Sequence, residues 1–410
     1  MWWLYNQAMY LLSFGLAVKG WWHRETREWN TTRKHHLKQL STLRKEAGGR
    51  PLVWMHCASL GEFEQGLPVL KMIRKQDENV YILVSFFSPS GFQQRKNTDH
   101  ADVVIYLPVD TQTNAQLVVA HLSPRLFIGV KYEFWWNYLR SLIRSKVPVV
   151  YLSVKMRENQ YLLKPWSQEF RKCLAQFSMI FTQDETTSQL LRQAGLTNTT
   201  VAGDTRVSSV LERLKKVRSF QHLEYLQSKD RITVVYGSVY VSDLPFIQHL
   251  MELKKDWFHI VVPHKIDKAS VAQMTAALSH QYHLWSQWQG EWKHQVLVVD
   301  TLGMLFDLYA YASLVYIGGG FERSVHNTLE PAAFGLPLAF GPKNKGFVET
   351  AWFLQNGIAT EIHEENDMTT FAASINGDQK ELKLAIESYF NDHSQAMMRI
   401  EDWFLKFYFK

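Results

Sequence analysis

The sequence predicts an α/β fold made of two doubly wound parallel-sheet domains, and three observations support this. Its 410 residues exceed what one core usually serves. Hydrophobic residues make up 46% of the chain, enough for two cores. From residue 51 onward, short apolar runs alternate with helical stretches, and near residue 231 the alternation begins again.

The first series of strands begins directly after Pro51. Its apolar, β-branched runs lack a regular polar alternation, as expected for strands buried on both faces. The expected strands are 52–59, 80–87, 103–109, 125–130, 147–154, 179–183 and 199–203. Helices are expected between them, for example at 65–76, 111–121 and 185–195.

A charged stretch at 207–230, expected to be helical, separates the two series. The strands expected after it are 231–239, 258–264, 294–301, 314–320, 337–342 and 358–362. We expect the helical tail 380–410 to pack on one domain through its aromatic end. Parallel sheets bind ligands at the carboxyl ends of their strands, so two such domains are expected to face a shared cleft.

The first 30 residues predict a membrane-associated helix with a basic flank. Residues 1–18 carry no charged side chain, and Trp2–Trp3 and Trp21–Trp22 are 19 positions apart, roughly 28 Å on a helix. A hydrocarbon core is about 30 Å thick with Trp at both interfaces. The helix is expected either to span the bilayer or to lie in its interface; a buried helix of the first domain is the alternative.

The charge of the chain is concentrated in one place. Residues 19–50 hold nine Lys or Arg and three acids, an excess equal to the whole net charge of +6. Basic residues on the C-terminal side of the apolar segment predict that the body lies at the cytoplasmic face of a membrane, next to anionic lipid. Nucleic acid is not expected as a partner, because no basic-aromatic surface pattern follows.

Cofactor chemistry finds little support in the sequence. The two cysteines, Cys57 and Cys173, have no metal-ligand spacing and suggest a reducing compartment. Neither an Asp-x-Asp pair nor a His/Cys/Asp cluster at metal spacing is present, so neither metal nor cofactor is expected. The triple glycine Gly318, Gly319 and Gly320 does not follow the G-x-G-x-x-G dinucleotide pattern.

Two strand ends carry residues suited to catalysis or phosphate binding. In "HCASLGEFEQG" (56–66), Glu62 and Glu64 stand where a strand turns into a helix. Glu62 is either a catalytic carboxylate or an acid that complements the helix dipole, which would lower its pKa and weaken it as a base unless burial raises it. At the end of a later strand, Gly237–Ser238 could approach a phosphate.

The segment "GGGFERSVHNTLEPAAFGLPLAFGP" (318–342) is the most specific motif. Asn327 could cap the following helix, while Glu330 could accept hydrogen bonds from ribose hydroxyls. The Glu-Pro pair and the later Gly-x-Pro resemble the nucleotide-sugar motif of GT-B glycosyltransferases.

With that segment in place, the chain resembles the Kdo (3-deoxy-D-manno-octulosonic acid) transferases over nearly its whole length. The matching stretches follow in the family's order: "SLGE" (59–62), "SFFSPSG" (85–91), "YLPVD" (106–110), "KYEFWWN" (131–137), "GDTRVSS" (203–209), "YGSVY" (236–240), "PHK" (263–265), "DTLGMLF" (300–306), "GGG" (318–320) and "HNTLEP" (326–331). The resemblance implies GT-B domains at 31–206 for the acceptor and 207–385 for the nucleotide sugar, after the segment 1–30 and before a C-terminal helix at 386–410.

The resemblance also implies an activity and its residues. Kdo would pass from CMP-Kdo to the lipid A precursor in lipopolysaccharide core synthesis, with inversion and without a metal. Glu62 would be the general base, and Glu133 and Arg206 would support the transition state. The family positions for CMP-Kdo fall on Ser238, Pro263, His264, Leu302, Gly303, Met304, Gly318, Gly319, Gly320, Asn327, Thr328, Leu329 and Glu330.

Three residues depart from the family pattern. Lys131 replaces the first acid of E-T-E, His264 replaces an arginine, and Arg206 replaces a lysine. Two rival functions follow: a membrane-associated GT-B enzyme that uses a UDP-sugar to make another glycolipid, or an inactive sugar-nucleotide binder.

Overall fold

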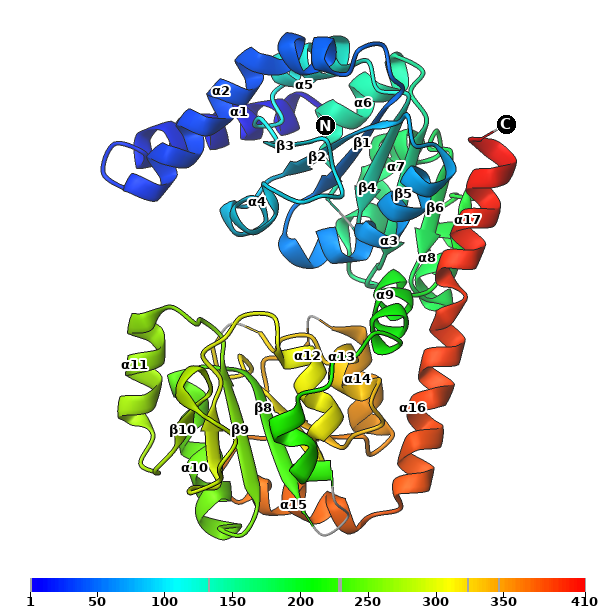
Figure 1. Cartoon of the computed structure of the whole chain (residues 1–410). Coiled ribbons are helices and arrows are strands. Elements are labelled where there is room, and N and C mark those ends of the chain that lie inside the picture. The colour runs from blue at the N-terminus through cyan, green and yellow to red at the C-terminus, as the bar shows by residue number, and fades with distance from the viewer. Residues whose placement is uncertain (1, 132, 228–230, 323, 346, 410) are drawn as a thin grey trace. The chain divides into compact units, whose positions relative to one another are not determined.

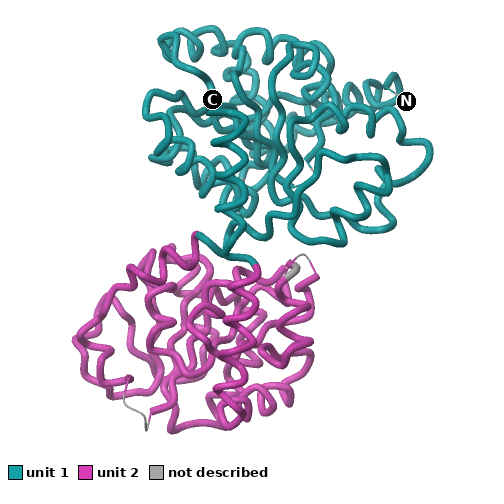
Figure 2. The backbone as a smooth tube through the Cα atoms, turned by 90° about the vertical axis from the view of Figure 1, so that its right-hand side faces the viewer, with its two compact units in different colours: residues 1–208, 393–410 teal, residues 209–392 magenta. Residues whose placement is uncertain are grey.

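The computed structural model describes residues 2–131, 133–227, 231–322, 324–345 and 347–409. The chain divides into two compact units (Figure 2). Unit 1 comprises Met1–Ser208 and His393–Lys410, and unit 2 comprises Ser209–Asp392. Each unit contains its own parallel sheet, as the sequence predicts.

In the described part of unit 1, seven parallel strands form a sheet in the order β3-β2-β1-β4-β5-β6-β7. In register, Leu52 of β1 pairs with Tyr81 of β2, and Val53 of β1 pairs with Leu126 of β4. The chain order reverses between β1 and β4, which makes this pair the switch point where such sheets bind ligands. The strands are β1 (Leu52–Cys57), β2 (Tyr81–Phe86), β3 (Val103–Tyr106), β4 (Leu126–Val130), β5 (Val149–Val154), β6 (Met179–Thr182) and β7 (Thr199–Val201). All seven lie within the ranges expected from the sequence.

Helices cover both faces of this sheet, and each face has its own core (Figure 1). Alternate residues of β1 serve the two cores: Trp54 points to one, and Val53 and Met55 to the other. The helices are α3 (Leu60–Gln76), α4 (Pro89–Arg95), α5 (Gln112–Leu122), α6 (Trp136–Arg144), α7 (Gln168–Leu174) and α8 (Glu185–Gln193), with short 3-10 turns η1 (Tyr161–Leu163) and η2 (Pro165–Ser167). The helix α9 (Thr205–Leu214) begins in unit 1 and ends in unit 2. The C-terminal α17 (Ala396–Phe407) buries Ile400 and Phe404 in the second core, so the tail packs on unit 1.

Two N-terminal helices, α1 (Trp2–Lys19) and α2 (Arg24–Glu46), lie side by side as a hairpin (Figure 1). The side-chain amide of Asn30 donates to the carbonyl of Leu16 across the pair. The sequence suggested that the two Trp pairs mark the ends of one helix. In the structure α1 ends at Lys19, and Trp21 and Trp22 lie in the turn that follows it. Among the described residues, none of the helices combines the length and the apolar character that a membrane crossing requires.

Asp110 of "YLPVD" fastens α1 to the domain. This fully buried carboxylate accepts hydrogen bonds from the Tyr5 hydroxyl at 2.6 Å and from the backbone N–H groups of Asn137 and Tyr138 at 3.0 and 2.9 Å. The two N–H groups belong to the first turn of α6, where helical donors lack intrahelical partners. One carboxylate therefore caps α6 and holds α1 against it.

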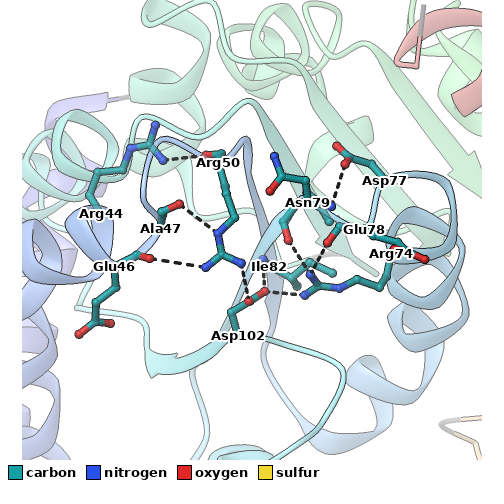
Figure 3. A network of polar contacts seen from close by, with 11 residues as sticks. Arg44, Glu46, Ala47, Arg50, Arg74, Asp77, Glu78, Asn79, Ile82 and Asp102 are labelled. Carbon is teal, nitrogen blue, oxygen red and sulfur yellow. Dashed lines mark hydrogen bonds and ion pairs between the residues drawn. The ribbon is translucent and has the colours of Figure 1, made fainter.

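A second polar network joins the end of α2 to the sheet edge (Figure 3). Asp102 accepts from Arg50 at 3.2 Å, from Arg74 at 2.5 Å and from the backbone N–H of Ile82 at 2.8 Å. Arg50 in turn donates to the carbonyl of Ala47 just beyond α2. The network connects α2, α3 and β2 at the end of the sheet opposite the strands' carboxyl ends.

The described residues of unit 2 form a second seven-stranded parallel sheet in the order β10-β11-β9-β8-β12-β13-β14. Here the chain order reverses between β8 and β12, where Gly237 pairs with Ile317. The strands are β8 (Thr233–Val239), β9 (Phe258–Pro263), β10 (His283–Leu284), β11 (Val296–Val298), β12 (Leu314–Ile317), β13 (Leu338–Phe340) and β14 (Ala359–Glu361). Sequence reasoning missed β10, which is only two residues long.

The helices of unit 2 are α10 (Leu244–Leu253), α11 (Lys268–Ala277), α12 (Leu305–Leu308), α13 (Leu329–Ala332), α14 (Val348–Gln355), α15 (Asp367–Ala373) and α16 (Gln379–Ser394), and its 3-10 turns are η3 (Gln221–Gln227), η4 (Val241–Asp243), η5 (Trp285–Gln287), η6 (Tyr309–Tyr311) and η7 (Ser374–Asn376). The sequence predicts a helix at 207–230, but in the structure α9 ends at Leu214 and a 3-10 turn, η3, follows at Gln221–Gln227. Arg218 binds Asp307, and the N–H of Phe220 donates to the hydroxyl of Tyr311, so tertiary contacts draw the chain out of the helix.

We predict that Asp110→Ala destabilises unit 1 by about 2–4 kcal/mol, because it leaves the Tyr5 hydroxyl and two helix N–H groups without an acceptor. Urea unfolding measures this loss, and limited proteolysis should cut α1 faster. The exposed Asp99→Ala is the control and should behave as wild type. An unchanged unfolding midpoint in Asp110→Ala would contradict the anchoring role.

Candidate active site

Glu62 lies in the first turn of α3, just beyond the carboxyl end of β1. Ser59 is the N-cap residue, so Ser59 and Glu62 have the spacing of a capping box. The Glu62 carboxylate reaches back and accepts a hydrogen bond from the backbone N–H of Ala58. This contact fixes the carboxylate at the switch point of the sheet.

Burial decides the basicity of Glu62. Its side chain is only 6% exposed, and burial, with the nearby carboxylate of Glu133, raises its pKa to about 8. The N–H of Ala58, the charge of Lys131 and the N–H of Ser59 each lower that pKa, but by less. The N–H groups at the helix N-terminus therefore position Glu62, and burial outweighs their lowering of its pKa.

Glu133 and Lys131 follow β4, the strand beside β1. Burial raises the pKa of Glu133, and the charge of Lys131 lowers it. The backbone carbonyl of Glu133 accepts a hydrogen bond from the Tyr151 hydroxyl at 2.9 Å, which holds the loop. Where the family pattern has an acid, this chain places an ammonium group close enough to act on both carboxylates.

Glu64 has a different environment from Glu62. Its carboxylate accepts from Arg95 at 2.6 Å, and both side chains are about 40% exposed. A surface ion pair of this kind contributes little to stability or chemistry. The two acids of "GEFE" are thus separated by burial, and Glu64 serves as a matched control for Glu62.

Arg206 stands at the start of α9 and pairs with Asp204. Burial opposes the ionisation of Asp204, but the charge and hydrogen bonds of Arg206 outweigh it and lower the pKa of Asp204. The guanidinium is 11% exposed and meets both carboxylate oxygens through its Nε at 3.1 and 3.0 Å. Asp204 therefore orients Arg206 and balances its charge.

In unit 2, the residues predicted to bind the nucleotide sugar lie on loops at the carboxyl ends of β8, β9, β11 and β12. Asp243 joins two of these loops: it accepts from the N–H groups of Tyr240 and Gly319 at 2.8 and 3.4 Å and from the Tyr316 hydroxyl at 2.8 Å. Ser238 is the second-last residue of β8. It has a left-handed φ of 57° and lies where the register of the pairing between β8 and β9 shifts. The two loops at this switch point form one connected unit.

The glycines at the end of β12 are required by packing. A Cβ on Gly318 would lie 2.4 Å from the carbonyl oxygen of Ser238, and one on Gly320 would lie 2.6 Å from Gly341. Gly319 has a φ of 91°, which favours glycine. Close contact with neighbouring strands explains these glycines whether or not a ligand approaches them.

The "HNTLEP" stretch forms the entrance to α13. The Asn327 side chain accepts from the N–H of Leu329 at 3.1 Å, in the manner of a cap. Thr328 and Leu329 are buried, and Glu330 accepts from Arg213 at 3.0 Å while remaining partly exposed. Of these four residues, Glu330 offers a carboxylate that solvent reaches.

Leu302, Gly303 and Met304 lie between β11 and α12. Leu302 is 81% exposed, Gly303 has a φ of 78°, and Met304 is buried. An exposed leucine beside a left-handed glycine forms a projecting turn, whereas the Met304 side chain belongs to the core.

Three aromatic rings stack beyond β8, β9 and β12. The ring centroids of His264 and His326 are 4.4 Å apart, and those of His264 and Tyr240 are 4.7 Å apart. Burial and the neighbouring His264 lower the pKa of His326 to about 4, and its Nε2 is buried without a partner. Pro263 is the last residue of β9, and His264 follows it. Sequence reasoning left His326 out of the site, although it opens the "HNTLEP" motif.

Among the described residues, no three His, Cys, Asp or Glu side chains come together in a group that could hold a metal ion.

Two parallel-sheet units, each with polar loops at its switch point, define a GT-B-like protein. The fold matches a UDP-GlcNAc 2-epimerase from Neisseria meningitidis with a TM-score of 0.60 and 15% identity, covering 87% of this chain and 100% of that one. At this identity the likeness establishes the fold alone.

The sequence comparisons point to one family. Residues 30–209, almost all within unit 1, match the model of 3-deoxy-D-manno-octulosonic-acid transferases (kdotransferase). A 3-deoxy-D-manno-octulosonic acid transferase of Aquifex aeolicus is 24% identical over 350 residues, covering 82% of this chain and 89% of the relative. One from Chlamydophila psittaci is 27% identical over 309 residues, covering 72% and 70%. The family model and these relatives make the chain similar to Kdo transferases over most of its length.

We predict that the pKa of Glu62 is about 8 and responds to its two neighbours. Removing a negative charge with Glu133→Gln should lower it, and removing a positive charge with Lys131→Met should raise it. Carbon-13 NMR of glutamate carboxyl groups measures the pKa, with Glu62→Gln assigning the resonance. Glu64→Gln is the control that should leave the pKa of Glu62 in place; an ordinary pKa near that of free glutamate would refute the burial argument.

Proposed function

We propose that this chain transfers Kdo from CMP-Kdo to a hydroxyl of the lipid A precursor, with inversion at the anomeric carbon. Similarity to Kdo transferases supports the transferred sugar. The observation that carries the mechanism is a buried carboxylate with a pKa near 8, Glu62, at the switch point of the sheet. Catalysis proceeds without a metal in this proposal.

Glu62 acts as the general base. As the acceptor oxygen forms its bond to the anomeric carbon, its proton passes to the Glu62 carboxylate, and the bond from that carbon to the CMP phosphate breaks on the opposite face. With a pKa of about 8, about a tenth of Glu62 is ionised at pH 7. The ionised carboxylate is a stronger base than that of an ordinary glutamate, because its pKa is higher. The rate should therefore rise with pH until Glu62 is fully ionised.

The leaving phosphate needs charge stabilisation more than it needs an acid. Arg206 and the Ser238 loop are the donors proposed for this role, and Glu133 supports the transition state with Arg206. Asp204 supports this role of Arg206. Because the buried carboxylate already orients the guanidinium, Arg206 loses little conformational entropy when it binds a phosphate. The histidine stack of His264 and His326 is the neighbouring surface for the nucleotide.

We predict that Glu62→Gln lowers the rate of transfer by about 10²–10⁴-fold, whereas Glu64→Gln retains the wild-type rate. Mass spectrometry of the lipid A precursor after incubation with CMP-Kdo measures the reaction, and the mass gained reports how many Kdo residues are added. Near-wild-type transfer by Glu62→Gln would reject Glu62 as the base. Thermal protection by UDP but not by CMP would point instead to a UDP-sugar enzyme.

We propose further that the α1–α2 hairpin rests in the cytoplasmic interface of the inner membrane, where the lipid acceptor lies. Its apolar side chains are unusually exposed: Leu11 and Phe14 are each 70% exposed, and Trp21 is 76% exposed. A cavity of about 670 Å³ between the hairpin and the domain is lined by apolar side chains of α1 and by Arg27 and Lys34 of α2. Apolar and basic groups together suit anionic lipid.

We predict that the double variant Trp21→Ala, Trp22→Ala reduces binding to vesicles of anionic lipid by about tenfold or more, because two large apolar side chains no longer enter the interface. Co-sedimentation measures the bound fraction. Trp166→Ala removes an exposed Trp from elsewhere in unit 1 and should have no effect. Equal binding of the double variant and wild type would rule out this orientation.

A further inference from the structure

Arg33 of α2 is a buried cation without a counter-ion. It is 4% exposed, and its guanidinium lies over the rings of Trp29 and Phe87, 3.6 and 4.4 Å from their centroids. Its Nη2 donates to the carbonyl of Phe87 at 3.1 Å, while Nε and Nη1 are buried with no partner. Among the residues that the structure describes, no carboxylate pairs with it. Burial lowers the pKa of Arg33 to about 9, so the group remains charged at neutral pH.

His56, at the end of β1, adds a second donor. Ser85 Oγ accepts from the Trp54 indole at 2.8 Å and lies 2.9 Å from His56 Nδ1. In the tautomer in which the Ser85 hydroxyl donates to Nδ1, His56 carries its proton on Nε2. That Nε2–H is buried with no partner. Burial, together with the charge of Arg33, keeps the pKa of His56 low, at about 3, so the ring is neutral.

Two indole groups complete the cluster. The Nε1–H groups of Trp29 and Trp135 are buried without acceptors. Phe87 connects the members: its ring centroid lies 5.5 Å from that of Trp29 and 4.6 Å from that of Trp135, and Trp135 lies 6.4 Å from His56. Four neighbouring side chains thus present N–H groups from five nitrogen atoms, and none of these groups has an acceptor.

Such a cluster is costly unless something accepts its hydrogen bonds. An unpartnered buried polar group carries a free-energy penalty, and a buried unpaired charge carries a larger one. Every unpartnered atom here is a donor, so the missing partner must be rich in acceptors and negatively charged. A phosphate or a carboxylate has this chemistry.

The cluster is next to the candidate base. The carbonyls of Cys57 and Ala58 accept from the N–H groups of Phe87 and Ser88, and the N–H of Ala58 donates to Glu62. Arg33 also lines the 670 Å³ cavity, along with Arg27 and Lys34. Arg33 therefore contacts both the cavity and, through the carbonyl of Phe87, the loop that is hydrogen-bonded to the strand end before Glu62.

We propose that Arg33, His56, Trp29 and Trp135 form a binding site for an anionic group, phosphate or carboxylate, on the acceptor substrate. The assignment to the acceptor rests on the proposed function; the binding of an anion does not.

The first test measures thermal unfolding in phosphate, acetate and chloride at equal ionic strength. Arg33→Met keeps the apolar volume and removes the donors, and Arg24→Met is the control, because Arg24 is exposed on the same helix. At a tenfold excess over Kd, phosphate or acetate should raise the melting temperature of wild type and Arg24→Met by about 3–5 °C more than that of Arg33→Met. The stronger of the two anions identifies the group.

In chloride alone, Arg33→Met should melt at or above the wild-type temperature, because it removes a buried charge that has no partner. A purely structural arginine would give the opposite result. Arg33→Gln, which keeps donors but no charge, provides a second variant should Arg33→Met fold poorly, and its response to the anions should be weakened. Equal responses to all three anions in wild type, or a full response in Arg33→Met, would overturn the proposal.

The second test links the site to the acceptor. In Kdo transfer assays, Arg33→Met should raise KM for the lipid acceptor at least tenfold and leave KM for CMP-Kdo unchanged. If phosphate or acetate raises the melting temperature only when Arg33 is present, but no Kdo is transferred, the proposed function is refuted and the anion site is supported. Transfer with unchanged acceptor KM in Arg33→Met would refute the assignment to the acceptor.

Discussion

Desolvation at the carboxyl ends of the unit 1 strands sets the chemistry of this protein. The same burial acts on three ionisable groups: it raises the pKa of Glu62, and it lowers those of Arg33 and His56. Aromatic side chains contribute to the burial of Arg33 and His56, because the ring of Phe87 lies against Arg33 and that of Trp135 against His56. The proposed base, Glu62, and the donor groups of Arg33 and His56 are therefore both desolvated near the carboxyl ends of neighbouring strands.

The topology of the sheets explains why these groups meet. In each unit the strand order reverses beside its first strand, between β1 and β4 in unit 1 and between β8 and β12 in unit 2. Loops that leave a switch point diverge to opposite faces and leave room for side chains between them. Glu62 and Glu133 occupy one such place, and Ser238 and the triple glycine occupy the other. Buried carboxylates support both arrangements, Asp110 by holding α1 and α6 and Asp243 by joining the β8 and β12 loops.

Most of the fold could be predicted from the sequence, because strands buried on both faces form recognisable apolar runs. Thirteen expected strands lie where strands are found, and the missed β10 is too short to form such a run. The helix expected at 207–230 is interrupted because Arg218 and Phe220 bind partners far along the chain, which local helix propensity does not reflect. At the site, the residue types were predictable, but the counter-ion of Arg206 and the stacking of His326 on His264 depend on contacts between separate loops.

The sequence by itself determined the two-sheet architecture, the resemblance to Kdo transferases and the position of Glu62 at a strand-to-helix junction, because each depends on local pattern and order along the chain. Only the tertiary structure decided that Glu62 is buried enough to be basic while Glu64 pairs with Arg95 at the surface. It also decided that Arg33, one of nine basic residues in an apparently solvated charged run, is buried among aromatic rings without a carboxylate. Desolvation is the physical reason for both results, since it depends on what surrounds a side chain in space rather than on its neighbours in sequence.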